Sequence, residues 1–179
     1  MIEFTVGIVC SGNTCRSPIA AAWLRHLLDG DPSRPAQIWT AGLKVEENEK
    51  KVEQEPLLVA LDMGMSPMLI RDLEKHEARE VSSEFRSTDL LVWITDPDKL
   101  GSSDDGDSTR IERMRDKAKA LGAFLLVVPE ADHAWEAKQR GESASKVMEA
   151  YRDQANSLRR WAWRLHSLIP STSATNSAG

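Results

Sequence analysis

The feature that most constrains the fold is a short apolar run followed at once by a small-polar loop and then a helix. Residues 4–9 (FTVGIV) predict a buried strand. Residues 11–17 are rich in Gly, Asn, Thr and Ser and predict a loop, after which Pro18 opens a helix, since a missing N–H costs nothing there. In open α/β sheets, ligands bind at the carboxyl end of such a strand.

The rest of the chain continues this alternation of strands and helices, which predicts an α/β fold with a parallel sheet. We expect one domain over residues 1–170 and a disordered, small-polar tail at 171–179. A charged segment at 44–55 is a loop or a helix start, 101–108 is a flexible polar loop, and 129–142 is irregular. Further strands are expected at 37–41, 90–94 and 123–128, and helices at 18–30, 56–63, 68–80, 111–121 and 144–169.

The loop between the first strand and the first helix carries residue types suited to phosphate chemistry. Its successive N–H groups can form a concave nest for a tetrahedral anion, and Gly12 permits the turn that the nest requires. Arg16 can hold two phosphate oxygens with its planar guanidinium. The same positive field favours the thiolate of Cys10, which predicts a nucleophile that attacks phosphorus and forms a phosphocysteine. The competing interpretation is an inert buried thiol beside an ordinary surface cation.

Composition narrows the possible partners. The chain of 179 residues carries a net charge of −5, which argues against nucleic acid as its main partner. Cys10 and Cys15 are its only cysteines, and their close spacing favours reactive chemistry in a reducing compartment over a disulfide scaffold. Neither a signal peptide nor a run long enough to cross a bilayer is evident. We therefore expect a cytoplasmic protein without a membrane partner.

The run VGIVCSGNTCRSPIAAAWL, residues 6–24, resembles the low-molecular-weight protein-tyrosine-phosphatase family, whose loop is commonly written V-C-x-G-N-x-C-R-S-P. Weaker similarities lie at Thr40-Ala41-Gly42 and at Asp89-Leu90-Leu91. The resemblance implies a four-stranded parallel sheet in the order 2-1-3-4 with helices on both faces, a three-layer α/β/α fold. It also implies that no metal or other cofactor is needed, and that the partner is a phosphorylated protein or a small phosphomonoester.

The resemblance also implies roles for the loop residues. Cys10 would be the nucleophile and Arg16 the phosphate clamp, while Asn13 and Ser17 would brace the loop by hydrogen bonds. Cys15 matches a family cysteine that can form a reversible disulfide with the nucleophile, although a merely packed loop residue fits it equally well. The expected substrate-binding residues are Ser11, Gly12, Asn13, Thr14, Cys15 and Ser17.

The general acid is where the chain departs from the family, which supplies an Asp in a D-P-aromatic segment after the fourth strand. No such segment is present here. Asp132 is the preferred candidate because it follows the fourth predicted strand closely, with Glu136 and Glu130 as alternatives and His133 behind them. A loop carboxylate that only faces solvent is the competing interpretation.

The substrate is left open by the sequence. Phosphotyrosine in a protein is the first expectation, yet the charged segment at 44–55 holds no aromatic wall, and Trp135 can serve as a wall or cover the core. A bacterial branch of the family acts on phosphoarginine with a C-T-G-N-T-C-R-S-P loop, which shares Thr14 but not Ser11 with this chain. The remaining alternative is a phosphate-binding or phosphoprotein-binding module with weakened turnover. Arsenate reduction through further cysteines is disfavoured, since only two cysteines exist.

Overall fold

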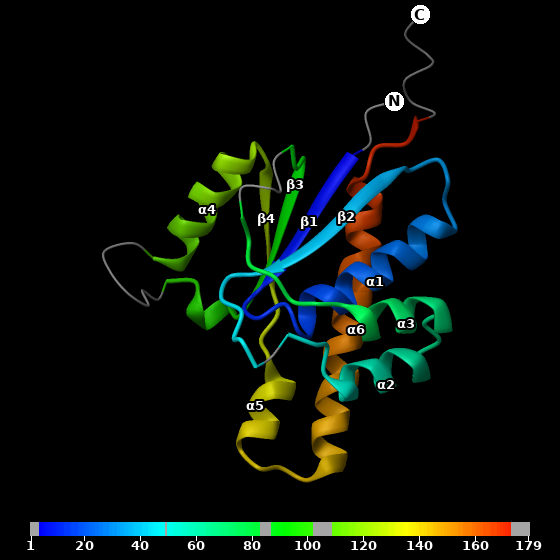
Figure 1. Cartoon of the computed structure of the whole chain (residues 1–179), viewed down its shortest axis with the longest axis vertical. Helices are drawn as coiled ribbons and strands as arrows, with labels where there is room; N and C mark the ends of the chain where they lie inside the picture. The colour runs from blue at the N-terminus through cyan, green and yellow to red at the C-terminus, as the bar shows by residue number, and fades with distance from the viewer. Residues whose placement is uncertain (1–3, 49, 83–86, 102–108, 173–179) are drawn as a thin grey trace, which may run out of the picture.

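The computed structural model describes residues 4–48, 50–82, 87–101 and 109–172. Its centre is a four-stranded sheet in the order β2-β1-β3-β4 (Figure 1). Every neighbouring pair of strands is parallel. The predicted sheet and its 2-1-3-4 order are therefore confirmed. The strands are β1 (Phe4–Cys10), β2 (Ala36–Gly42), β3 (Leu90–Thr95) and β4 (Phe124–Pro129).

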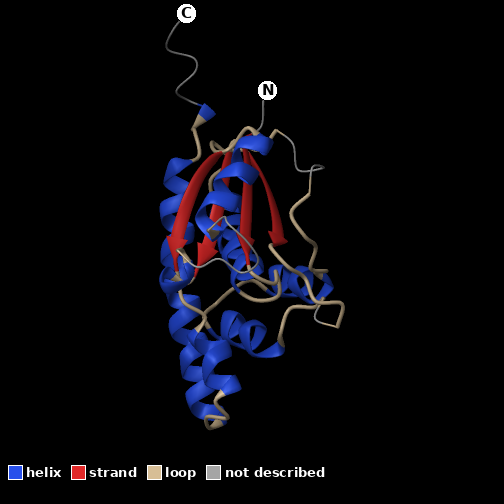
Figure 2. Cartoon of the chain, turned by 90° about the vertical axis from the view of Figure 1, so that its left-hand side faces the viewer, coloured by secondary structure: helices blue, strands red, loops and turns tan. Residues whose placement is uncertain are grey.

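Helices cover both faces of the sheet, so the molecule has the predicted three layers (Figure 2). Alternate residues of β1 point to opposite faces: Val6 and Ile8 pack against the α1 and α6 side, and Val9 packs toward α4. All three side chains are fully buried, which explains the continuous apolar run in this central strand. The helices are α1 (Arg16–Asp29), α2 (Gln54–Asp62), α3 (Pro67–Lys75), α4 (Arg110–Leu121), α5 (His133–Gln139) and α6 (Ala144–Leu168).

The first helix begins at Arg16, two residues before the expected start at Pro18. Pro18 still lies in the first turn, where backbone N–H groups have no acceptor within the helix, so its missing N–H costs nothing. The earlier start places both Arg16 and Ser17 in that first turn. The N-terminus of α1 therefore begins directly after the loop that follows Cys10.

Two expectations about helices were wrong. The helix expected over 68–80 ends at Lys75, because the next residues extend and bond elsewhere: Ala78 N–H donates to Lys50, and Glu80 forms a bridge with Gly42. The segment 129–142 is not irregular throughout, because it contains α5, whose Ala134 and Ala137 are buried in a cluster with residues of α6. In both cases, contacts with residues distant in sequence determine the local secondary structure.

Some expectations lie outside the described residues, namely most of the polar loop at 101–108 and of the tail at 171–179. The long helix expected over 144–169 is confirmed as α6. Its lower half extends past the carboxyl ends of the strands and lies beside α5 (Figure 1). Within the described ranges, no helix combines the length and apolar character needed to cross a membrane.

Candidate active site

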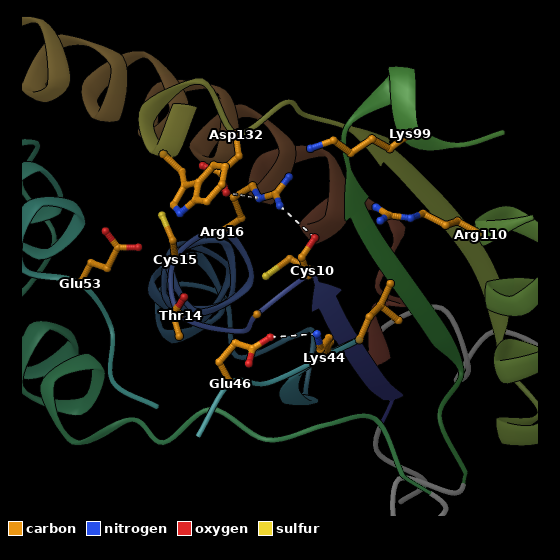
Figure 3. Close-up of a pocket in the computed structure, with 14 residues that line it drawn as sticks. Cys10, Thr14, Cys15, Arg16, Lys44, Glu46, Glu53, Lys99, Arg110 and Asp132 are labelled. Atoms are coloured by element: carbon orange, nitrogen blue, oxygen red, sulfur yellow. Dashed lines mark hydrogen bonds and ion pairs between the residues drawn. The ribbon is translucent and has the colours of Figure 1, made fainter. Parts of the chain in front are cut away.

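A cavity of about 370 Å³ opens at the carboxyl end of β1, where the sequence places the phosphate loop. It collects side chains from the end of β1 and the loop after it, from the segment between β2 and α2, from the turn after β3, and from the beginnings of α4 and α5 with the residue just before α5 (Figure 3). Its wall consists of Cys10, Ser11, Gly12, Thr14, Cys15, Arg16, Leu43, Lys44, Glu46, Glu53, Lys99, Arg110, Asp132 and Trp135.

Cys10 is the last residue of β1 and is 2% exposed. The backbone N–H of Asn13 donates to its Sγ at 3.3 Å, and the Ser17 hydroxyl lies 3.1 Å from the same sulfur. Ser17 also donates to Asn13 Oδ1 at 2.9 Å. A hydroxyl has only one proton, so Ser17 accepts from Cys10 when Cys10 is a thiol. When Cys10 is a thiolate, Ser17 can turn its own proton toward the sulfur. The surroundings therefore offer donors to a negative sulfur.

The loop is braced by residues that lie outside it. Asn13 has a positive φ of 59°, and its backbone carbonyl accepts a hydrogen bond from His76 Nε2 at 3.1 Å. Burial lowers the pKa of His76, which favours the neutral ring. Gly42 lies so close to the loop that a Cβ there would be 2.8 Å from the carbonyl oxygen of Ser11. The loop path thus depends on the end of β2 and on the segment after α3.

Arg16 is 5% exposed and is held from several directions. Its Nη1 donates to the carbonyl oxygen of Glu130 at 2.9 Å, and its Nη2 donates to Ser11 Oγ at 3.4 Å. Its Nε pairs with Asp132 Oδ2 at 3.2 Å. These contacts fix a planar guanidinium at the wall of the cavity, where it can present donors to the oxygens of a phosphate.

Among the candidate acids, only Asp132 lines the cavity. The Glu130 carboxylate accepts a hydrogen bond from Ser157, and burial raises its pKa above the ordinary value. Glu136 pairs with His133 and with Arg140. The structure therefore brings Asp132 together with Cys10 and Arg16, and it does not bring Glu130, Glu136 or His133 to the cavity.

Cys15 and Cys10 are both free cysteines. The Cys15 thiol donates to Gln154 Oε1 at 3.3 Å. Burial raises the pKa of Cys15 well above its ordinary value, and the charges of Asp132 and Glu53 act in the same direction. Cys15 is thus held as a neutral thiol in the loop that follows Cys10.

Four cavity residues are not identified by the sequence reasoning: Leu43, Lys44, Lys99 and Arg110. Glu46 and Glu53 belong to the charged segment at 44–55, whose acidic side chains either favour a basic partner or form a solvated face. Figure 3 shows Lys99 and Arg110 on the side of the cavity opposite Glu53. The Glu53 carboxylate accepts from the Tyr151 hydroxyl at 2.6 Å and pairs with Lys138 at 3.1 Å. Their common signal is position, because each follows or precedes an element whose end lies at the carboxyl edge of the sheet.

No metal site was found within the part of the chain that the structure describes. There, no group of three or more His, Cys, Asp or Glu side chains is arranged to hold an ion. The groups available at the cavity include the Cys10 sulfur with a backbone N–H donor beside it, the Arg16 guanidinium and the Asp132 carboxylate.

Comparisons with known proteins agree with this geometry. The model of the family described as low molecular weight phosphotyrosine protein phosphatase matches residues 5–133. No curated protein matches at a significant level.

Solved structures share the fold at low sequence identity. A low molecular weight phosphotyrosine phosphatase from Vibrio cholerae O395 is 18% identical with a TM-score of 0.65, covering 99% of this chain and 100% of that one. The tyrosine phosphatase AmsI of Erwinia amylovora is 20% identical with a TM-score of 0.60, covering 94% of each chain. The arginine phosphatase YwlE of Geobacillus stearothermophilus is 20% identical with a TM-score of 0.61, covering 93% of each chain.

Proposed function

The chain belongs to the low molecular weight phosphotyrosine protein phosphatase family. From this premise we propose that it hydrolyses phosphotyrosine in proteins, with Cys10 as nucleophile, Arg16 as phosphate clamp and Asp132 as general acid and base. The observation that carries the proposal is that these three side chains line one cavity at the carboxyl end of β1. The other candidates for the general acid, Glu130, Glu136 and His133, do not line that cavity.

In the first step, the Cys10 thiolate attacks phosphorus in line with the ester oxygen. The S–P bond forms, the P–O bond to the phenol breaks, and Asp132 gives its proton to the leaving oxygen. Arg16 and the loop N–H groups meet the charge on the equatorial oxygens, which is where a preorganised site stabilises the transition state most. The products of this step are a phosphocysteine and a neutral phenol.

In the second step, the Asp132 carboxylate takes a proton from a water molecule whose oxygen attacks phosphorus. The S–P bond breaks, inorganic phosphate leaves, and Cys10 departs as a thiolate. The Ser17 hydroxyl lies 3.1 Å from Sγ and can turn its proton to the departing sulfur. Asp132 ends this step protonated and ready for the next substrate.

A second substrate class is favoured by the acidic side of the cavity. Glu53 and Glu46 line it together with Asp132, and carboxylates recognise a guanidinium better than a phenol ring. Thr14 also lines the cavity and leaves more room than a large apolar side chain would. Phosphoarginine is therefore the alternative substrate, whereas Leu43 and Trp135 offer the apolar contacts that a phosphotyrosine ring needs.

The proposal is tested by measuring hydrolysis of an aryl phosphate by the wild type and by Cys10→Ser. We expect kcat of the variant to fall by about 10³-fold or more, since loss of the nucleophile in an acyl-transfer enzyme costs about 10⁶-fold. Equal rates would exclude Cys10 as nucleophile. Phosphate binding without turnover in the wild type would instead identify a binding module.

The substrate is tested on the same preparation with two peptides of one sequence, carrying either phosphotyrosine or phosphoarginine. The proposal expects the higher kcat/KM for the phosphotyrosine peptide. A higher kcat/KM for the phosphoarginine peptide would establish the alternative. A further comparison with Glu53→Gln would then show whether that carboxylate selects the guanidinium, because only the phosphoarginine rate should fall.

A further inference from the structure

Gln154 places a buried amide directly behind the proposed general acid. It lies in the middle of α6 and is 4% exposed, although glutamine is usually a surface residue. Its Nε2 donates to Asp132 Oδ1 at 3.1 Å and to the carbonyl oxygen of Ala131 at 3.4 Å. Its Oε1 accepts from the Cys15 thiol at 3.3 Å. Both ends of the amide are therefore satisfied, as a buried polar group requires.

The Asp132 carboxylate is held at both of its oxygens. Gln154 donates to Oδ1, and Arg16 Nε pairs with Oδ2 at 3.2 Å. Asp132 is also the N-cap residue of α5, a position where an aspartate usually accepts from the first free N–H groups of the helix. It makes no such capping bond here. Its carboxylate is instead turned toward α6 and the cavity wall, and Gln154 is the neutral donor that keeps it there.

The partners of the Gln154 amide determine which way round it stands. The Asp132 carboxylate and the Ala131 carbonyl only accept, so they require Nε2 to face them, and Oε1 is left to accept from the Cys15 thiol. Burial raises the Cys15 pKa, so the thiol keeps the proton that this bond needs. A reversed amide would place its NH₂ group against the thiol hydrogen and its oxygen against a carboxylate. The chain Cys15–Gln154–Asp132 thus has a single favourable arrangement.

We propose that Gln154 is a positioning residue for the reaction, which holds the Asp132 carboxylate at the cavity for proton transfer while the Cys15 thiol supports the Gln154 amide by donating to its oxygen. This inference rests on the proposed role of Asp132. The physical reason for a positioning role of Gln154 is that Arg16 must also bind the phosphate. When substrate draws the guanidinium toward phosphate oxygens, Gln154 remains as the donor that keeps Asp132 in place. Misplacing a catalytic group by about 1 Å can cost on the order of 10²-fold in rate.

The test uses the dependence of rate on the leaving group. Phenyl phosphate releases a weakly acidic phenol that needs a proton, whereas 2,4-dinitrophenyl phosphate releases a stable anion that does not. Gln154→Met keeps the volume of the side chain and removes its hydrogen bonds. We expect kcat/KM for phenyl phosphate to fall by about 10-fold or more, and kcat/KM for 2,4-dinitrophenyl phosphate to change by less than about threefold.

Three further variants make the result specific. Gln37→Met makes the same chemical change at an exposed position near the start of β2, at the opposite end of the sheet from the cavity, and should leave both rates unchanged. Cys15→Ala removes the donor to Gln154 Oε1, and Cys15→Ser restores one. We therefore expect a selective loss for phenyl phosphate in Cys15→Ala that is largely recovered in Cys15→Ser. This pair keeps the inference testable even where Gln154→Met folds poorly.

Asp132→Asn separates the inference from the function on which it rests. It should show the leaving-group-selective loss in a stronger form. If Asp132→Asn shows that loss while Gln154→Met does not, or if Gln154→Met lowers both rates by one factor, the positioning role is overturned and the general acid stands. If Asp132→Asn lacks the selective loss, the general-acid assignment fails, and the role of Gln154 fails with it.

Discussion

At the scale of single residues, the phosphate loop is shaped from outside as much as from within. Asn13 adopts a left-handed conformation that asparagine tolerates better than most residues. Its side chain accepts from Ser17 and its carbonyl accepts from His76. The loop carries the proposed chemistry, and residues distant in sequence contact its backbone and hold its path. Substitutions at those distant residues should therefore affect rate as well as stability.

Gly42→Ala is the sharpest such case. A Cβ at this position would lie 2.8 Å from the Ser11 carbonyl oxygen and 3.0 Å from the Gly12 carbonyl carbon, so the loop backbone must move. Overpacking of this kind costs about 1–3 kcal/mol, and a loop displaced by a fraction of an ångström loses transition-state contacts. We expect kcat/KM for an aryl phosphate to fall by about 10-fold or more. Gly101→Ala, where a Cβ meets nothing within 4 Å, is the control and should retain wild-type kinetics.

His76 predicts a pH dependence of stability. Burial lowers its pKa in the folded protein, partly offset by the bond to the Asn13 carbonyl, so folding favours the neutral ring. A depressed histidine pKa contributes stability above the unfolded value of about 6.5, and this contribution is lost as the pH falls through the folded pKa. His76→Gln keeps an N–H donor and does not titrate. Between pH 7 and pH 5, the melting temperature of the wild type should therefore fall further than that of the variant, and parallel melting curves would contradict this assignment.

At the scale of elements, the sequence was most informative where a pattern is local. All four strands were predicted to within one residue at either end, because buried apolar runs flanked by turn residues are unambiguous. The helix after Pro67 was predicted five residues too long, since its end is determined by pairing of the following segment with Gly42 and Lys50. Helix α5 was missed because a helix this short depends on packing against α6, which local periodicity does not reveal.

The segment between β4 and α5 yields a prediction about Glu130. Burial raises its pKa, so its contribution to stability is fully present below the unfolded value of about 4.3 and is lost as the pH rises through the folded pKa. Glu130→Gln remains neutral and keeps an oxygen that can accept from Ser157. We expect the variant to melt at a higher temperature than the wild type at pH 7, with no difference below about pH 4.

The same variant tests the choice of general acid. Because the Glu130 carboxylate bonds Ser157 and does not line the cavity, kcat/KM of Glu130→Gln should stay within about twofold of the wild type for phenyl phosphate. A loss that depends on the leaving group would transfer the acid role from Asp132 to Glu130. Thermal melts and kinetics on one preparation thus answer both questions about this residue.

At the scale of the whole molecule, the site exists only because parallel strands end at one edge of the sheet. The shared location of Cys10 and Arg16, the proposed nucleophile and clamp, was predictable from the sequence, since both lie on one continuous strand–loop–helix unit. Lys99 and Arg110 were not predictable, because they reach the cavity from segments far apart in sequence and carry no motif. The role of Gln154 was not predicted either, because this residue carries no motif and lies on an amphipathic helix whose buried face is otherwise apolar.

Convergence of these elements on one anion site predicts that ligand binding stabilises the entire fold. A ligand that binds only the native state at 100 times its Kd adds about 2.7 kcal/mol. For a domain of this length, about 2–4 °C of melting temperature accompanies each kcal/mol, so saturating inorganic phosphate should raise the melting temperature by about 5–10 °C. Arg16→Ala should abolish most of this shift, because it removes the guanidinium that meets the anion while leaving the strand and helix in place. Chloride at equal ionic strength is the control, since screening alone would move both proteins alike. A phosphate-induced shift that persists in Arg16→Ala would show that the anion binds elsewhere, and the cavity at the end of β1 would lose its assignment as the phosphate site.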